Sequence, residues 1–131
     1  MASRSQGHIL VVDDEPLIRE MAREILENQG FCVSEASDGQ EGLELFIDNP
    51  NRFDLIILDL VMPRLHGFQV MDRILQLAPM TRILISSGFS PDSRPELTRS
   101  TPTTAFLAKP YRSRDLLEHV QRLLGAPKEE G

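Results

Sequence analysis

Short, continuous apolar runs alternate along this chain with longer segments in which apolar residues recur every three or four positions. The runs are typical of strands in a parallel sheet that is covered on both faces, and the longer segments are typical of amphipathic helices. The predicted strands contain residues 9–12, 31–33, 52–58, 83–85 and 105–108. This alternation predicts an α/β fold, a doubly wound five-stranded parallel sheet that is flanked by helices and has right-handed crossovers.

Start and stop signals mark the helices between these strands. They indicate one helix that begins at Pro16 and stops before Gly30, a second that opens at Asp38 or Gly39 and ends near Asn49, a third that follows Gly67 and is closed by Pro79, and a last helix that is capped by Ser113. Residues 91–104, between the fourth and fifth strands, contain three prolines and many Ser and Thr residues. Because these residues favour turns, we expect a short or irregular fourth helix there.

Length and composition fit one globular domain. The chain has 131 residues, of which 40% are hydrophobic and 26% are charged. A chain of this length buries roughly two-thirds of its unfolded surface, so it can form a substantial core. We expect a single domain over residues 8–124, with flexible tails at 1–7 and 125–131.

Charge, cysteine content and hydropathy exclude several classes of function. The net charge of −6 and the pI near 5.0 argue against direct nucleic-acid binding, which needs clustered cations. Cys32 is the single cysteine, so no disulfide can form within the chain, and we expect it to be a small buried core residue. No stretch approaches the ~18 apolar residues of a membrane span, and residues 1–7 lack the apolar core of a signal peptide. The sequence therefore predicts a cytoplasmic protein without membrane association.

Three of the apolar runs lead directly into charged residues. The residues that follow these runs are Asp13, Asp14, Asp59 and Lys109. Open α/β sheets bind their ligands beyond the carboxyl ends of the strands, so we expect three carboxylates and one ammonium to converge at one edge. Carboxylates packed this closely repel, and a cation among them stabilises their anionic forms. The pattern predicts a site for a hard divalent metal, with Asp59 and Lys109 placed to handle an anionic group.

Lys109 also stands out by composition. Of the 14 basic residues, 12 are arginine, and only Lys109 and Lys128 are lysine. A compact ammonium on a flexible stem reaches a phosphate oxygen or a carboxylate where the wider guanidinium fits poorly. The alternative is an ordinary solvated lysine at the end of a strand.

Together with the short motifs around them, these residues resemble the receiver domain of two-component response regulators. The resemblance covers residues 8–124 and rests on Asp13-Asp14 after the first strand, Asp59 followed by Met62-Pro63 and Gly67, Ser87-Gly88 after the fourth strand, and Lys109-Pro110 after the fifth. It implies a flavodoxin-like sheet with the strand order 2-1-3-4-5. It also implies a phosphoacceptor domain that switches conformation to regulate a partner or an attached domain, and the short loops are similar to those of receivers attached to hybrid sensor histidine kinases.

The resemblance assigns a role to each aspartate. Asp59 would be the nucleophile that takes a phosphoryl group from the phosphohistidine of a sensor histidine kinase or a phosphotransfer protein. Asp14, Asp59 and the backbone carbonyl of Val61 would ligate Mg²⁺, and Asp13 would hold metal-bound water. Such a domain catalyses its own phosphorylation and slow dephosphorylation but is mainly a signalling switch. A helix cap or a solvated surface pair is the alternative for these acids.

The resemblance also implies a switch next to this site. A cis Lys109–Pro110 bond would aim the lysine back at the acids. Ser87 is preferred over Ser86 because it directly precedes a small residue, and its hydroxyl would bind a phosphoryl oxygen while Phe106 moves inward behind it. Plain core packing is the alternative for Phe106.

Other functions fit these residues less well. A haloacid-dehalogenase-like phosphatase needs a second aspartate two residues after the nucleophile, where this chain has Val61. A pseudo-receiver that acts through protein contacts alone stays open. In the family, Val61 and Phe89 would flank the attacking water, and because neither can orient water, we expect slow loss of the phosphoryl group. The output partner stays open, and His8, His66 and His119 are too scattered for a metal site.

Overall fold

One five-stranded parallel sheet organises the molecule, and its strands lie in the order β2-β1-β3-β4-β5. The computed structural model describes residues 7–60, 67–88 and 103–125. In chain order, the elements are β1 (His8–Val12), α1 (Pro16–Asn28), β2 (Cys32–Ala36), α2 (Gly39–Asp48), β3 (Leu55–Leu58), α3 (Gly67–Leu77), β4 (Ile83–Ser87), β5 (Thr104–Ala108) and α4 (Ser113–Gly125). The strand order and the alternation of strands and helices confirm the predicted fold class.

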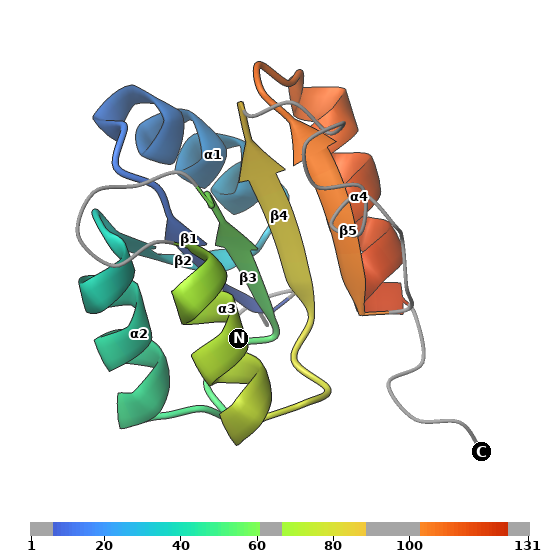
Figure 1. Ribbon diagram of the computed structural model, residues 1–131. Coiled ribbons are helices and arrows are strands. Elements are labelled where there is room, and N and C mark those ends of the chain that lie inside the picture. The colour runs from blue at the N-terminus through green and yellow to red at the C-terminus, as the bar shows by residue number, and fades with distance from the viewer. Residues whose placement is uncertain (1–6, 61–66, 89–102, 126–131) are drawn as a thin grey trace.

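Helices cover both faces of the sheet (Figure 1), and two separate cores result. Successive side chains of a strand point to opposite faces, so Leu10 and Val12 of β1 enter the core beneath α2 and α3, here called the α2–α3 core. Ile9 and Val11 enter the core beneath α1 and α4, here called the α1–α4 core. Continuous apolar strands are therefore buried on both sides, as the sequence pattern predicts.

Local signals explain most of the helix ends. Pro16 begins α1, and Gly30 follows its end with a φ of 98°, a left-handed conformation that glycine adopts without strain. Asp38 caps α2 by accepting a hydrogen bond from the backbone N–H of Glu41. The last helix begins one residue earlier than predicted, since Ser113 is its first helical residue and not its cap.

Two details of the predicted strands are wrong. The third strand begins at Leu55 and not at residue 52, because Asp54 lies just before it and its side chain accepts a hydrogen bond from the backbone N–H of His8 (2.8 Å). Cys32 is exposed and not buried. It is the first residue of the edge strand β2, and alternation sends its neighbours Phe31 and Val33 into the α1–α4 core instead.

Some predictions fall outside the described residues. These are the irregular helix expected within residues 91–104, of which only 103 and 104 are described, the pair Val61 and Phe89 expected to flank the attacking water, and most of the two tails. Within the described part of the chain, Gly125 is the last residue of α4, and no helix combines the length and the apolar character that a membrane span requires.

Candidate functional site

The residues that follow β1, β3 and β5 are held by the sheet itself. The backbone N–H of Asp13 donates to the carbonyl of Ala36 (3.1 Å), and that of Asp59 donates to the carbonyl of Val12 (3.0 Å). The N–H of Lys109 donates in the same way to the carbonyl of Ser87 (3.0 Å). The three functional side chains therefore start from backbone positions that the strand ladder fixes, at the carboxyl edge of the sheet.

Lys109 is the centre of a cluster of ion pairs at this edge. Its Nζ lies 2.7 Å from Asp13 Oδ2, 3.0 Å from Asp59 Oδ2 and 2.8 Å from Glu15 Oε1. The side chains of Asp13 and Asp59 are each 5% exposed and that of Lys109 is 11% exposed, whereas Glu15 is 59% exposed. Two of the three pairs are thus buried, so removing one partner would leave the other charge buried without compensation. The Lys109–Pro110 peptide bond is cis.

Burial and charge shift the pKa values of the groups in this cluster. Burial raises the pKa of Asp13 above its usual value, and the hydrogen bond from Lys109 opposes part of that rise. Burial alone would lower the pKa of Lys109, but its hydrogen bonds to Asp13, Glu15 and Asp59 outweigh burial and raise it. Burial together with the charge of Asp13 raises the pKa of the nearby Tyr111 to about 12. Lys109 therefore stays a cation at any physiological pH.

Three carboxylates at the site can share one metal ion. Asp13, Asp14 and Asp59 each offer a carboxylate oxygen, and these oxygens all lie within 4.8 Å of one another. Hard oxygen donors at such spacing suit Mg²⁺, which uses one or two carboxylates and keeps several waters. The donor set present in the described residues therefore fits the predicted cation. Val61, the remaining predicted ligand, lies outside the described residues.

The two serines at the end of β4 face opposite cores. Ser87 pairs with Ala108, next to Lys109, and it points to the same face of the sheet as Ile85 and Phe106. Ser86 points to the α1–α4 face, where its Oγ is buried and has no hydrogen-bond partner among the described residues. Ser87 thus shares its face with the predicted aromatic switch residue, and Ser86 does not.

Sequence reasoning missed the contact that Glu15 makes in the site and the packing role of Gly67. Glu15 is the N-cap residue of α1, yet its side chain caps nothing and reaches Lys109 instead. Gly67 begins α3 directly against the acceptor strand, and a Cβ added there would lie 2.4 Å from both the carbonyl oxygen of Asp59 and the Cα of Leu60. The run of acids before Pro16 was a visible signal for Glu15. The close approach at Gly67 appears only once α3 is packed on the sheet.

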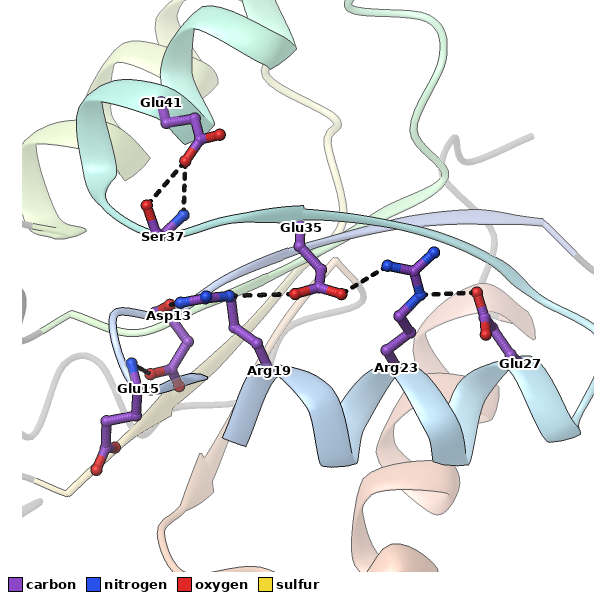
Figure 2. A network of polar contacts seen from close by, with 8 residues as sticks. All are labelled: Asp13, Glu15, Arg19, Arg23, Glu27, Glu35, Ser37 and Glu41. Carbon is purple, nitrogen blue, oxygen red and sulfur yellow. Dashed lines mark hydrogen bonds and ion pairs between the residues drawn. The ribbon is translucent and has the colours of Figure 1, made fainter. Parts of the chain in front are cut away.

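The turn between β1 and α1 is tied to β2 by a polar network (Figure 2). Arg19 reaches both the backbone carbonyl of Asp13 and the carboxylate of Glu35 on β2. Arg23 binds the same Glu35 and also Glu27, one turn further along α1. The turn that carries the first two aspartates is therefore held from the helix that follows it.

A parallel sheet of order β2-β1-β3-β4-β5, with an acid cluster and a lysine at its carboxyl edge, defines a flavodoxin-like α/β protein with a candidate cation site. The chain belongs to the response regulator receiver domain family, whose family model matches residues 9–121. This membership confirms the resemblance seen in the sequence.

Individual relatives support the same placement. The chain is 33% identical over 118 residues to the transcriptional regulatory protein SrrA of Staphylococcus aureus, which covers 90% of the chain and 48% of SrrA. The chain thus spans about half the length of the curated relatives it matches. The chemotaxis protein CheY4 of Vibrio cholerae superposes with a TM-score of 0.78 at 32% identity, over 91% of the chain and 99% of CheY4. The receiver domain from the hybrid histidine kinase CckA superposes with a TM-score of 0.74 at 30% identity, over 89% of the chain and 99% of that domain.

Proposed function

We propose that this receiver domain accepts a phosphoryl group on Asp59 from the phosphohistidine of a sensor histidine kinase or a phosphotransfer protein. The observation that carries the proposal is the buried contact between Lys109 Nζ and Asp59 Oδ2 at 3.0 Å, beside the carboxylates of Asp13 and Asp14. One acceptor carboxylate is thus next to both a fixed cation and an oxygen-rich cation site. Such a pairing serves the transfer of a dianionic group better than it serves stability alone.

In the proposed reaction, a carboxylate oxygen of Asp59 forms a bond to phosphorus while the bond from phosphorus to the histidine nitrogen of the partner breaks. The electron pair of that bond leaves with the imidazole, and the product is an acyl phosphate. A carboxylate is a modest nucleophile, so positioning and charge neutralisation must supply most of the rate. Asp59 is held in place by its backbone bond to Val12, and Lys109 offers an N–H donor to a phosphoryl oxygen.

Asp13, Asp14 and Asp59, with the carbonyl of Val61, are the residues that would hold Mg²⁺. When bound, the cation neutralises the acids and the phosphoryl oxygens, so that an anion can approach an anionic site. The spacing of the three carboxylates supports this assignment. Asp13 is held by Lys109 and by the N–H of Glu15 (2.9 Å), which supports the role of holding metal-bound water.

The response to phosphorylation is proposed to pass through Ser87 and Phe106. Ser87 ends β4 beside Lys109 and shares a sheet face with Phe106, which packs partly buried against the α2–α3 core. A hydroxyl that turns toward the new phosphate would vacate space on that face for the ring, which is a two-state rearrangement biased by the added charge. Ser86 points to the opposite face, away from Phe106, and this favours Ser87 for the role.

The cellular setting is part of the same proposal. We place the domain at residues 8–124, in the cytoplasm, in contact with a kinase or a phosphotransfer protein, and with an output partner or attached domain that its relatives leave open. The similarity to the receiver domain of the hybrid histidine kinase CckA supports attachment to such a kinase as one arrangement.

The test is phosphorylation of the chain by acetyl phosphate with Mg²⁺, followed by intact-protein mass spectrometry. The wild type should gain one phosphoryl group, and Asp59→Asn should gain none while remaining folded, because the amide is nearly isosteric but poorly nucleophilic. Asp72→Asn, at an exposed position of α3, is the matched control and should behave like the wild type. A wild type that takes up no phosphoryl group would instead support a pseudo-receiver, and an adduct on Asp59→Asn would place the acceptor elsewhere.

A further inference from the structure

The turn that carries Asp13, Asp14 and Glu15 is closed into a ring by Arg19. The Nη1 of Arg19 donates to the backbone carbonyl of Asp13 at 2.7 Å, and the backbone N–H of Arg19 donates to the carbonyl of Glu15 at 3.1 Å. Inside the ring, the N–H of Glu15 donates to Asp13 Oδ1 at 2.9 Å. Arg19 therefore contacts both ends of the turn, and Figure 2 shows the contact that its side chain makes with Asp13.

The carbonyl that Arg19 binds has a special position in this turn. It belongs to the peptide that joins Asp13 to Asp14, and a peptide unit is planar. A plane that is held in place restricts the ψ of Asp13 and the φ of Asp14, which together set the directions of both side chains. A guanidinium on this one oxygen therefore controls where two carboxylates point relative to Asp59.

The guanidinium is itself oriented from β2. Its Nε donates to Glu35 Oε1 at 3.2 Å, and the side chains of Arg19 and Glu35 are only 16% and 26% exposed. Hydrogen bonds from Arg23, first, and then from Arg19 lower the pKa of Glu35, so that it stays ionised. The planar fork of arginine serves the two acceptors from two separate nitrogens, whereas all donors of a lysine sit on one nitrogen.

We propose that Arg19 is a positioning residue for the acceptor site, and that it holds the Asp13–Asp14 peptide so that both carboxylates face the cation site beside Asp59. Its functional consequence rests on the Mg²⁺-dependent phosphorylation proposed above. Removing Arg19 should let the turn rotate and should spread the three carboxylates, with weaker Mg²⁺ binding and slower phosphoryl uptake as the result.

The competing explanation is that Arg19 only ties α1 to β2. Arg23 separates the two explanations, because it also binds Glu35 (2.7 Å) from the same helix and makes a second ion pair with Glu27 (3.0 Å), yet no contact joins it to Asp13. Its side chain is 47% exposed, and exposed ion pairs contribute little to stability. A purely structural tie would show in global stability, more for the less exposed Arg19 than for Arg23, and would leave the exchange of the Glu15 amide unchanged relative to the central strands.

The experiment compares Arg19→Gln, Arg19→Lys and Arg23→Gln with the wild type in the full 131-residue chain. The first measurement is hydrogen exchange of the Glu15 amide by NMR without metal, expressed relative to amides of the central strands. Arg19→Gln should exchange about tenfold faster at this amide, because a hydrogen bond from a charged donor no longer restrains the turn. Arg23→Gln should match the wild type, and Arg19→Lys should lie between, because its ammonium keeps the charge but has its donors on a single nitrogen.

The second measurement is the affinity for Mg²⁺ and the rate of phosphoryl uptake from acetyl phosphate. Arg19→Gln should lose about tenfold in Mg²⁺ affinity, the loss usual for residues that orient metal ligands, and Arg23→Gln should lose none. Equal effects of Arg19→Gln and Arg23→Gln, or a loss of thermal stability in Arg19→Gln with an unchanged Glu15 amide, would overturn the positioning role. If Arg19→Gln fails to fold, the amide exchange of Arg19→Lys against Arg23→Gln decides the question. A wild type that binds no Mg²⁺ would refute the proposed function, whereas the metal-free amide exchange would still decide the role of Arg19.

Discussion

Replacing Lys109 by alanine removes the cation that faces the buried acids of the site. The side chains of Asp13 and Asp59, each 5% exposed, would lose an ammonium that now lies 2.7 and 3.0 Å from their carboxylate oxygens. Breaking a buried ion pair by deleting one partner costs about 3–5 kcal/mol, because the other charge stays buried without compensation. Lys109 is itself slightly exposed, so we expect a loss near the lower end, about 3 kcal/mol without metal.

Magnesium should reduce the loss of stability that Lys109→Ala causes. Three aspartate oxygens within 4.8 Å of one another remain in the variant, and a divalent cation no longer competes with the ammonium for two of them. A ligand at 100 times its Kd stabilises the folded state by about 2.7 kcal/mol, which is similar to the expected loss. The variant should therefore bind Mg²⁺ more tightly than the wild type and remain folded at millimolar Mg²⁺.

Lowering the pH should also reduce the difference in stability between Lys109→Ala and the wild type. The pKa of Asp13 is already raised above 3.8 by burial, and without Lys109 it should rise further. A group with a raised pKa binds its proton more tightly in the folded state, so the free energy of unfolding increases as the pH falls through the folded pKa toward 3.8. The stability deficit of Lys109→Ala should accordingly be largest near neutral pH.

The assay combines urea unfolding, with and without Mg²⁺, and the rate of phosphoryl uptake from acetyl phosphate. Lys109→Ala should unfold at lower urea and should phosphorylate slowly even when Mg²⁺ has restored its stability, because a donor to the phosphoryl oxygen is missing. Lys109→Arg should keep more stability but should also phosphorylate slowly, since the guanidinium has another reach and shape. If the wild type and both variants take up the phosphoryl group at the same rate, Lys109 is a bystander and the electrostatic reasoning is refuted.

Two further predictions concern stability. Gly67→Ala places a Cβ 2.4 Å from backbone atoms of Asp59 and Leu60, which cannot move independently of β3. We therefore expect the free energy of unfolding to fall by about 3 kcal/mol, the upper end for overpacking, and phosphorylation to slow. Gly125→Ala, whose Cβ meets no described atom within 4 Å, is the control, and equal urea midpoints for the two variants would contradict the packing argument. Burial and Arg52 lower the pKa of His8, so the neutral form is favoured in the folded state and the free energy of unfolding should decrease as the pH falls below 6.5. His8→Gln should flatten this dependence in urea unfolding between about pH 7.5 and 5.5, and an unchanged slope would show that His8 is not its source.

The convergence of Asp13, Asp59 and Lys109 could be predicted from the sequence because a parallel sheet brings the ends of its strands to one edge. An apolar run that stops at a charge marks such an end, and the structure indeed has all three residues directly after strands. Side chains in turns are harder to predict, because their direction depends on a few backbone dihedrals. The ion pair between Glu15 and Lys109 and the hydrogen bond from Arg19 to the carbonyl of Asp13 both depend on such side-chain directions.

The wrong expectation for Cys32 has a different cause. Its apolar neighbours Phe31 and Val33 fill the α1–α4 core, so the segment reads as a buried run. Whether the intervening residue is also covered depends on its place in the sheet, and β2 is an edge strand. The pattern of apolar residues along a chain indicates which residues form a strand, but it does not indicate whether that strand lies in the centre or at the edge of the sheet.

The position of Tyr111 gives this domain a natural optical probe. The chain contains one tyrosine and no tryptophan, so its near-ultraviolet emission comes chiefly from one phenol. That phenol packs against the α1–α4 core and interacts electrostatically with Asp13, Lys109 and Asp59. Metal binding, phosphoryl uptake and the release of Lys109 from its carboxylates all alter the electric field at this ring. The unlabelled protein can therefore report the state of its own acceptor site through the intensity of tyrosine fluorescence, in real time and without an engineered dye.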